Sequence, residues 1–561
     1  MAATGIEVQK DMQEPLFTRE EMEGFIRKGY WRSEVTSDFC DWNAIAYPDR
    51  EALVDSRQRL TWSQAKKQMD RIALGLLDSG IGQGDVVVVQ LYNSVELYLI
   101  RLACEKAGII LAPVPLTWGH NELLSIFQRA NVKGVIIPLR FGKIDYFQMV
   151  QEVRADVTSL SHVFTVGDEA PPGAISVKEM VQQPLEEKYP ANYLEKTKGT
   201  AFGCSAIRPT GGTTGMPKFV AEASCARLCT GRVYIERTGL SNSDIIGVFG
   251  RLNGGAGDPL AYRGAPQVGA KVVLLEHFTP ETGCRLIEKE KLTAIGLVPA
   301  MLAQLLRYQG LDKHDFSSLR FILSSTALLP FELGREAERR LGVPIINGYG
   351  STESASLTLG SITQSQEARL ASVGRPLDGN ETKLIDDECQ AVPQGSVGEI
   401  IVRGPHRTGI FYNDPELTKE SWKDGWFHVG DLAKFDAAGN LMLVGRKSDM
   451  IIRGGQNIYP REVEDILIQH VKIEQAAIVR MPDAIMGEKA CAYVVAAPGQ
   501  ELSFQDMLTF LEGKKVAKYK WPERLEIVCE FPMASGEKVN KKVLEHDVTM
   551  KLRQELINLE K

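Results

Sequence analysis

The 561-residue sequence lacks the features of nucleic-acid-binding and membrane-spanning proteins. Its formal net charge of −7 provides no basic surface for nucleic acid or an anionic membrane. No apolar run approaches the ~18 residues that cross a bilayer. The first 25 residues contain no basic region followed by an apolar one, so we expect no secretory signal. We therefore predict a cytoplasmic protein without a transmembrane segment.

Cysteines are few and do not form a recognisable set. There are nine, scattered along the chain and odd in number. Cys225 and Cys229 are four residues apart, like neighbours on a helix face, but no His or Cys completes a metal-binding pattern. We interpret them as buried reduced thiols.

The chain is too long for one hydrophobic core, so at least two domains are expected. A β-branched run at 85–93 predicts a buried strand, and an amphipathic helix is predicted at 94–108. Similar patterns recur at 132–139, 269–278, 293–306 and 319–325. This alternation favours an α/β fold with largely parallel sheets.

The pattern of predicted secondary structure changes after about residue 385, where the expected strands become shorter and the turns tighter, as at 395–404 and 437–446. From 447 onward the sequence is typical of a small α+β module that includes a helix at 460–470 with proline at its start. We predict two domains, 1–446 and 447–561.

Residues 210–218, TGGTTGMPK, concentrate glycine and threonine before a lysine. Glycine lets successive backbone N–H groups converge on an anion, threonine adds hydroxyl donors, and lysine adds charge. Pro217 precedes the lysine and Phe219 follows it, so this is not the P-loop pattern. Taken alone, the stretch is either a polyphosphate site or a flexible surface turn.

Five further stretches follow in order: NGYGSTES (347–354), GWFHVGDLAKFDAAGNLMLVGRKSDMI (425–451), RGGQNIYPREVE (453–464), MPDAIMGEKACAYVV (481–495) and FPMASGEKVNKKVL (531–544). Together with TGGTTGMPK, the set resembles the motifs of the adenylate-forming enzymes, which are the acyl-CoA synthetases, aryl-acid-activating ligases and luciferases. The resemblance extends over about the whole chain.

The resemblance implies a large N-terminal domain of parallel β-sheets with helices and a distorted β-barrel, and a small mobile α+β C-terminal domain. It also implies a reaction in which a carboxylate attacks Mg-ATP to give an acyl-adenylate and pyrophosphate, after which a thiol, usually CoA, displaces AMP. The expected cofactors are Mg²⁺, ATP/AMP and CoA, and the expected partner is a small-molecule carboxylic acid, not nucleic acid. A homodimer is one option for the oligomeric state.

Residue by residue, the resemblance implies a catalytic role for Lys538, which follows Pro532 by six positions. It implies that Glu353 binds magnesium and that Thr352 lies near the α-phosphate. The ATP/AMP-binding residues implied are Thr210, Gly211, Gly212, Thr213, Thr214, Lys218, Tyr349, Gly350, Asp431 and Arg446. Gly455 would line the CoA channel, and Ser448 would be the hinge.

The sequence departs from the family pattern at several positions. Gly536 is one place early, Glu537 stands next to Lys538, Val429 replaces a usual threonine, and the hinge position is Ser448 rather than Asp or Lys. A carboxylate beside Lys538 would raise the lysine pKa or repel phosphate, which leaves the geometry of this tail open.

The acyl pocket is expected to contain Asn253, Gly254 and Thr326. Thr326 stands where relatives usually have glycine, and its β-branched side chain should shorten the cavity. Asn253 aligns with an asparagine of the 2,3-dihydroxybenzoate-activating relatives, whereas Leu252 replaces their histidine. We therefore expect a compact cyclic acid, aromatic or alicyclic, rather than a fatty acid.

The leading interpretation is an AMP-forming acid–CoA ligase, reversible because thioester and phosphoanhydride bonds are of similar energy. The alternatives are an aryl-acid ligase that loads a carrier protein, a catalytically weak adenylate-binding protein and an oxidative enzyme of the luciferase kind.

Overall fold

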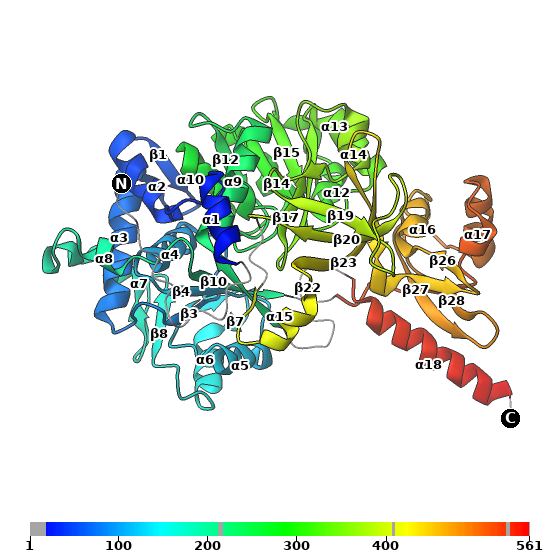
Figure 1. Ribbon diagram of the computed structural model, residues 1–561, viewed down its shortest axis with the longest axis horizontal. Coiled ribbons are helices and arrows are strands. Elements are labelled where there is room, and N and C mark those ends of the chain that lie inside the picture. Colours follow the sequence, from blue (N-terminus) through cyan, green and yellow to red (C-terminus); the bar gives the residue numbers. More distant parts are fainter. Residues whose placement is uncertain (1–17, 211–216, 407–409, 534–538, 560–561) are drawn as a thin grey trace. The chain divides into compact units, whose positions relative to one another are not determined.

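The computed structural model describes residues 18–210, 217–406, 410–533 and 539–559 (Figure 1). The chain divides into two compact units: unit 1 comprises Met1–Thr382 with Val402–Phe427, and unit 2 comprises Lys383–Ile401 with His428–Lys561. This division reflects compactness. The domain boundary expected at 446/447 stays a prediction.

Unit 1 is built on two sheets whose central strands run parallel. The first sheet has the order β18 (Arg375–Pro376), β17 (Ala355–Leu359), β16 (Ile345–Ser351), β15 (Phe321–Ser324), β14 (Ala294–Leu297), β12 (Ile245–Val248), β13 (Lys271–Leu274), β1 (Glu51–Val54), β2 (Arg59–Thr61). The second has the order β21 (Ile410–Phe411), β11 (Lys218–Ala223), β10 (Cys204–Thr210), β4 (Ile110–Pro113), β3 (Val86–Val89), β5 (Gly134–Pro138), β8 (His162–Val166), β9 (Ile175–Ser176). A short hairpin pairs β6 (Arg140–Phe141) with β7 (Ile144–Asp145).

The helices and helical turns of unit 1 are α1 (Arg19–Arg27), α2 (Thr36–Ala46), α3 (Trp62–Asp78), α4 (Val95–Lys106), α5 (His120–Arg129), α6 (Tyr146–Arg154), α7 (Val177–Gln182), η1 (Leu185–Lys188), α8 (Tyr193–Thr197), α9 (Ser224–Thr238), the π-helix η2 (Pro259–Gly264), α10 (Ala265–Val268), α11 (Pro280–Glu290), α12 (Pro299–Arg307), η3 (Leu311–Lys313), α13 (Phe331–Leu341), α14 (Gln366–Ala371) and α15 (Pro415–Ser421).

Alternating side chains of the strands create separate cores on the two faces of each sheet. Val87 and Val89 of β3 enter a core shared with α3, α4 and the first sheet, whereas Val86 and Val88 pack on the opposite face with α5 and α6. Helices α11, α12 and α13 cover the other face of the first sheet. Both faces of β3 are therefore buried, which explains its continuous apolar run. The predicted α/β class and the strands expected near 85–93, 132–139 and 319–325 are confirmed.

A further sheet has the order β19 (Glu381–Ile385), β20 (Gly398–Arg403), β23 (Trp426–Phe435), β22 (Trp422–Lys423), with β24 (Leu441–Arg446) beside β23. Most of it lies in the part of the sequence, after about residue 385, where shorter strands and tight turns were expected. The division between the two units falls within β19, β20 and β23.

Unit 2 contains a sheet of order β26 (Gln456–Ile458), β25 (Ile451–Arg453), β28 (Gly487–Ala496), β27 (Ile473–Asp483), with β29 (Arg524–Ile527) beside β28. Its helices and helical turns are η4 (Lys447–Asp449), α16 (Pro460–Leu467), α17 (Phe504–Gly513), η5 (Lys518–Lys520) and α18 (Lys541–Leu559). Ile478 faces a core with α16 and α17, whereas its neighbours Ala477 and Val479 face α18. This alternation confirms the predicted α+β module.

None of the described helices is long and apolar enough to cross a membrane. All nine cysteines are free thiols, and Cys225 and Cys229 are buried, as expected. Burial raises the pKa of Cys229 to about 11, so it remains a neutral thiol.

His406 is a buried polar group of unit 1. Its Nε2 donates to the carbonyl oxygen of Asp378 over 2.8 Å, and Nδ1 lies 3.2 Å from the hydroxyl of Thr230. The side chain has no exposed surface, and burial lowers the pKa of His406 from 6.5 to about 4. The folded protein therefore holds a neutral imidazole here.

We predict that unit 1 loses stability in a defined acid window. As the pH falls below 6.5 the unfolded chain takes up a proton at His406, whereas the folded chain does so only near 4. The free energy of unfolding should thus fall between pH 6.5 and about pH 4, and His406 contributes at most about 3 kcal/mol to that fall. Thermal unfolding at pH 7 and pH 4.5 should show a smaller acid-induced decrease of Tm in His406→Gln than in the parent protein. Equal decreases would contradict the assignment.

Candidate active site

The segments expected to bind acid and nucleotide converge at one edge of the first sheet. Strands β12, β14, β15 and β16 are parallel, and the register places Val248 beside Gly296, Leu297 beside Ser324, and Ser324 beside Asn347. The segments that follow β12, β15 and β16 therefore emerge side by side. Ligands of open α/β sheets bind at such carboxyl edges.

The turn after β16 presents Thr352 and Glu353, and Tyr349 and Gly350 precede it on the strand. Two serines close the turn: Ser351 N donates to Ser354 Oγ over 3.2 Å, and Ser354 N donates to Ser351 Oγ over 3.0 Å. Both Thr352 and Glu353 are partly exposed. The turn thus fixes the backbone while leaving the predicted phosphate and magnesium ligands accessible.

Gly350 is required by packing. A Cβ on this residue would lie 2.0 Å from the carbonyl oxygen of Ala355 on the antiparallel partner strand β17. Ala355 itself has a φ of 56°, which is uncommon for a residue with a side chain. The tight return of the chain after the turn therefore depends on glycine at 350.

The segment 250–258, called here the acyl wall, follows β12 and is held from several sides. The side chain of Asn93 accepts from Leu252 N over 2.9 Å and donates to Gly250 O over 2.7 Å. Gly296 of β14 leaves room for Ala256, whose carbonyl oxygen would be 2.1 Å from a Cβ at 296. The wall is therefore a fixed backbone surface and not a loose loop.

Thr326, one of the residues predicted for the acyl pocket, lies beside this wall. Gly254 and Gly255 have φ of 146° and 67°, and a Cβ at Gly255 would lie 3.1 Å from Oγ1 of Thr326. Asn253 Oδ1 is a buried atom with no hydrogen-bond partner in the described part of the chain. The structure thus brings the 253–255 stretch and Thr326 together, with a polar atom left for a ligand.

Thr326 has a φ of 78°. A β-branched residue in this left-handed region is strained, and such strain is typical of ligand-binding segments. The side chain is exposed and stands at the carboxyl end of β15. Glycine would adopt this conformation without strain but would remove the side chain that faces the acyl wall.

The glycine-rich stretch lies between two paired strands. Thr210, the last residue of β10, pairs with Lys218, the first residue of β11. Gly211, Gly212, Thr213 and Thr214 lie outside the described residues. The hydroxyl of Thr210 is buried and makes no hydrogen bond with any described residue, and Lys218 Nζ lies 5.7 Å from the centre of the Phe411 ring. A donor and a cation thus flank the predicted phosphate segment.

In unit 2, Asp431 and Arg446 face each other across β23 and β24, with Arg446 Nε 3.2 Å from Asp431 Oδ1. Ser448 follows in η4, where its hydroxyl donates to Asp449 Oδ1 over 2.8 Å and its carbonyl accepts from Arg480. Gly455 has a φ of 82°, and a Cβ there would meet no atom within 4 Å. Open space at Gly455 suits a residue that borders a channel, which remains a prediction.

The predicted catalytic residue Lys538 and its neighbour Glu537 lie outside the described residues. On either side of them the chain closes on itself, since Asn540 N donates to Pro532 O over 2.7 Å and Met533 bridges Val539. The role of Lys538 stays a prediction.

The predicted magnesium ligand is a single carboxylate, that of Glu353. In the described part of the chain, no group of three or more His, Cys, Asp and Glu side chains is placed to hold a metal ion. Magnesium is often held by one or two carboxylates together with substrate phosphates, so a single accessible glutamate fits a magnesium ion delivered with ATP.

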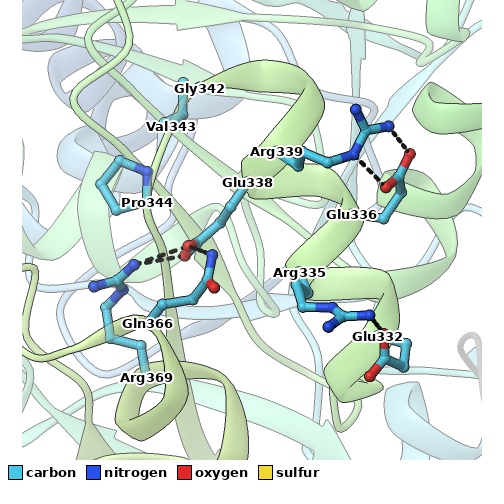
Figure 2. A pocket seen from close by; sticks show the side chains of 10 residues that line it. All are labelled: Glu332, Arg335, Glu336, Glu338, Arg339, Gly342, Val343, Pro344, Gln366 and Arg369. Atoms are coloured by element: carbon cyan, nitrogen blue, oxygen red, sulfur yellow. Dashed lines mark hydrogen bonds and ion pairs between the residues drawn. The ribbon is translucent and has the colours of Figure 1, made fainter.

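A separate cavity of about 780 Å³ lies along α13 and α14 and contains none of the predicted site residues (Figure 2). Its charged side chains pair with one another: Glu332 with Arg335, Glu336 with Arg339, and Glu338 with Arg369. Charge is balanced within this surface depression, so it is not a candidate active site.

The sequence did not reveal the groups that fix the acyl wall, namely Asn93, Arg101, Arg208 and Asp258. One signal was present, because Arg101 interrupts the otherwise apolar stretch LYLIRLAC of α4. A charge on such a helix face needs a buried partner. The partner, Asp258, is 157 residues away and could not be identified from the sequence.

The family model described as "AMP-binding enzyme" matches residues 40–412, and the model described as "AMP-binding enzyme C-terminal domain" matches residues 462–538.

Curated relatives cover almost the whole chain. A medium-chain fatty-acid–CoA ligase of Escherichia coli (strain K12) is 31% identical over 96% of this chain and 95% of its own length. A salicylyl-CoA synthase / salicylate adenylyltransferase of Streptomyces sp. is 31% identical over 94% of this chain and 96% of its own. The crystal structure of the anthranilate CoA ligase AuaEII with anthranoyl-AMP has the same fold, with a TM-score of 0.83, 24% identity, and coverage of 93% of this chain and 98% of that one.

We predict that Gly350→Ala disrupts the turn that carries Thr352 and Glu353. The added Cβ cannot fit beside the Ala355 carbonyl, so the β16–β17 pair must open, at a cost of about 1–3 kcal/mol. Adenylation, measured as ATP–pyrophosphate exchange, should fall at least about tenfold.

The matched control is Gly360→Ala at the other end of the hairpin, where a Cβ meets its nearest atoms at an ordinary 3.5 Å. This variant should keep both exchange activity and Tm. Equal effects of the two variants would contradict the packing argument.

Proposed function

From the premise that the chain belongs to the AMP-binding enzyme family and is an AMP-forming acid–thiol ligase, we propose that its acid is a compact cyclic carboxylic acid and its thiol acceptor is CoA. ATP and CoA are the substrates used by this family of acyl-CoA and aryl-CoA ligases. The proposal concerns the acid, the acceptor and the residues that carry the reaction.

The observation that carries the proposal is the contact between Thr326 and the acyl wall. A β-branched side chain held at φ 78° stands beside Gly255, so the space above the wall is shortened by the methyl and hydroxyl groups. A ring fits a short cavity, whereas a long alkyl chain does not. Relatives of equal identity are named for a fatty acid and for salicylate, so similarity alone does not choose the acid.

The wall also offers polar atoms to the substrate. Asn253 Oδ1 and the buried hydroxyl of Ser324 have no hydrogen-bond partner among the described residues. Buried polar atoms without partners are costly unless a ligand or water satisfies them. We propose that a bound acid or its adenylate satisfies Asn253.

In the proposed reaction, a carboxylate oxygen attacks the α-phosphorus of ATP, the bond to the bridging oxygen breaks, and pyrophosphate leaves. Both reactants are anions, so charge neutralisation and positioning must supply most of the rate enhancement. Lys218 and the hydroxyl of Thr210 would bind the leaving pyrophosphate, and Thr352 would bind the α-phosphate. Glu353 would hold Mg²⁺, which neutralises phosphate charge when bound.

In unit 2, we propose that Asp431 binds the ribose hydroxyls with Arg446 beside it, and that Tyr349 of unit 1 stacks on adenine. In the second step the CoA thiolate attacks the acyl carbonyl and AMP leaves. Lys538 would act in the first step and Gly455 would border the CoA channel in the second, with Ser448 as the hinge between the two conformations.

We predict that pyrophosphate exchange is fastest with a cyclic acid. In a panel of benzoate, cyclohexanecarboxylate, octanoate and dodecanoate, kcat/KM should be highest for one of the two cyclic acids. A maximum with dodecanoate would contradict the proposed substrate class, and thioester formation with a carrier protein but not with CoA would contradict the proposed acceptor.

Thr326→Gly should extend the tolerated chain length and raise kcat/KM for octanoate several-fold. It should not lower Tm, since relief of roughly 1–2 kcal/mol of strain offsets the entropic cost of glycine, about 0.5–1 kcal/mol. Thr326→Ala is the control for backbone strain, because it removes the methyl and hydroxyl groups but keeps a Cβ at positive φ. If neither variant changes the acid preference, Thr326 does not limit the pocket.

We predict that Lys538→Ala separates the half-reactions. Adenylation should fall by about 100-fold or more, because a cation that binds the reacting groups is lost. Thioester formation from supplied acyl-adenylate and CoA should be retained. Lys541→Ala is the control, since Lys541 pairs with Glu464 over 2.6 Å and has a structural contact instead. Equal loss of both half-reactions in Lys538→Ala would contradict its assignment.

A further inference from the structure

A buried cluster of charged side chains, called here the Asp258 cluster, lies behind the acyl wall. Asp258 is 1% exposed, and its carboxylate contacts Arg101 Nη2 at 2.8 Å, Arg208 Nη2 at 3.1 Å and Arg263 Nε at 2.5 Å. Burial alone would raise the pKa of Asp258, but the Arg208, Arg263 and Arg101 guanidiniums lower it well below its usual range. The carboxylate is therefore ionised and fully engaged.

The cluster continues from Asp258 to two further carboxylates. Arg208 Nε lies 2.8 Å from Glu222, and Arg227 lies 3.1 Å from Glu105 and 3.8 Å from Glu222. All of these side chains are less than 9% exposed. Among the described residues of the cluster, four guanidiniums thus face three carboxylates. In a medium of low dielectric, such a set holds its members in one geometry, since moving one charge leaves another uncompensated.

The elements joined by this cluster are those that carry the two substrate sites. Arg101 of α4 also donates to Leu252 O of the acyl wall over 2.7 Å, and Asp258 is the last residue of that wall. Arg263 belongs to η2, the π-helix that begins directly after Asp258. Arg208 belongs to β10, two residues before Thr210, and is opposite Val220 of β11. One carboxylate therefore links the wall to the strand that leads into the predicted phosphate segment.

Arg208 also approaches the wall directly. A Cβ on Gly254 would lie 3.7 Å from Arg208 Nη1 and would meet no other atom within 4 Å. Nη2 donates to Asp258 over 3.1 Å, whereas Nε lies 2.8 Å from a Glu222 oxygen but makes no hydrogen bond with any described residue. The planar guanidinium thus spans β11, the end of the acyl wall and the backbone at Gly254, a geometry that only arginine provides.

We propose that Arg208, acting through Asp258, is a positioning residue that couples the acyl wall to β10, so that the acid and the nucleotide each strengthen the binding of the other. An acid seated against Gly254 further restricts the motion of the wall, and the ion pair of Arg208 with Asp258 passes that restriction to the strand ahead of the phosphate segment. By linkage, the nucleotide must favour acid binding by the same factor. The proposal rests on the adenylation reaction and not on which acid is used.

The test measures this coupling directly. The dissociation constant of the acid that gives the fastest pyrophosphate exchange is determined by calorimetry, without and with saturating α,β-methylene-ATP. In the parent protein the analogue should tighten acid binding by about tenfold. In Arg208→Met the ratio of the two dissociation constants, without and with the analogue, should fall to about one. In Arg208→Lys it should be reduced, because an ammonium keeps the charge but cannot face Glu222 and Asp258 together.

Arg369→Met is the matched control. Arg369 is likewise buried and paired, with Glu338 at 2.8 Å, but it lies on α14 and contacts neither the acyl wall nor β10. It should lose a similar amount of thermal stability and keep the tenfold ratio. A merely structural role for Arg208 would make the two methionine variants behave alike, and that result would overturn the proposal.

Two other outcomes also decide whether the proposed coupling holds. If Arg208→Met does not fold, Arg208→Lys alone is used, and an unchanged ratio in it overturns the proposal. A parent protein in which the analogue does not alter acid affinity overturns it as well. The proposed substrate class fails separately, if only open-chain acids support pyrophosphate exchange. The coupling between acid and nucleotide binding can still be measured then, because it is determined with whichever acid is active.

Discussion

The ionised carboxylate of Asp258, enclosed by three guanidiniums, is the interaction on which the candidate site depends. It ends the acyl wall, begins the π-helix η2 and contacts β10 through Arg208. Gly296 of β14 allows Ala256 of the wall to approach closely, and Gly255 of the wall leaves room for Thr326, but glycine gives no rigidity. The charged cluster supplies that rigidity, so a backbone with few side chains can still define a pocket of fixed shape.

The parallel sheet supplies the second constraint. Because β12, β15 and β16 end at one edge, residues near 253, 326 and 352 become neighbours although about a hundred residues separate their extremes. The acyl wall and the turn that carries Thr352 and Glu353 thus have different supports, one ionic and one made by Ser351 and Ser354.

Much of the fold could be predicted from local pattern. The run at 85–93 and the helix at 94–108 correspond to β3 and α4, although the helix is not amphipathic as predicted, because all residues of α4 except Glu96 are buried. The ordered motifs identified the family, whereas the binding roles expected of Gly350 and Thr326 stay predictions. The φ of Thr326, the clash that requires Gly350, and the pairing of Arg101 and Arg208 with Asp258 depend on contacts between distant segments. No local sequence pattern encodes such contacts. The roles of Lys538, Gly455 and Ser448 remain predictions.

The central proposal is that a short pocket over the acyl wall binds a cyclic acid, which the enzyme converts to an adenylate. The most direct measurement is a crystal structure of the protein soaked with Mg-ATP and a mixture of benzoate, cyclohexanecarboxylate and dodecanoate. The account predicts density for a cyclic acyl-adenylate, with its ring between Gly254 and Thr326 and its adenine against Tyr349. A bound dodecanoyl-adenylate, or a ring bound away from the acyl wall, would contradict it.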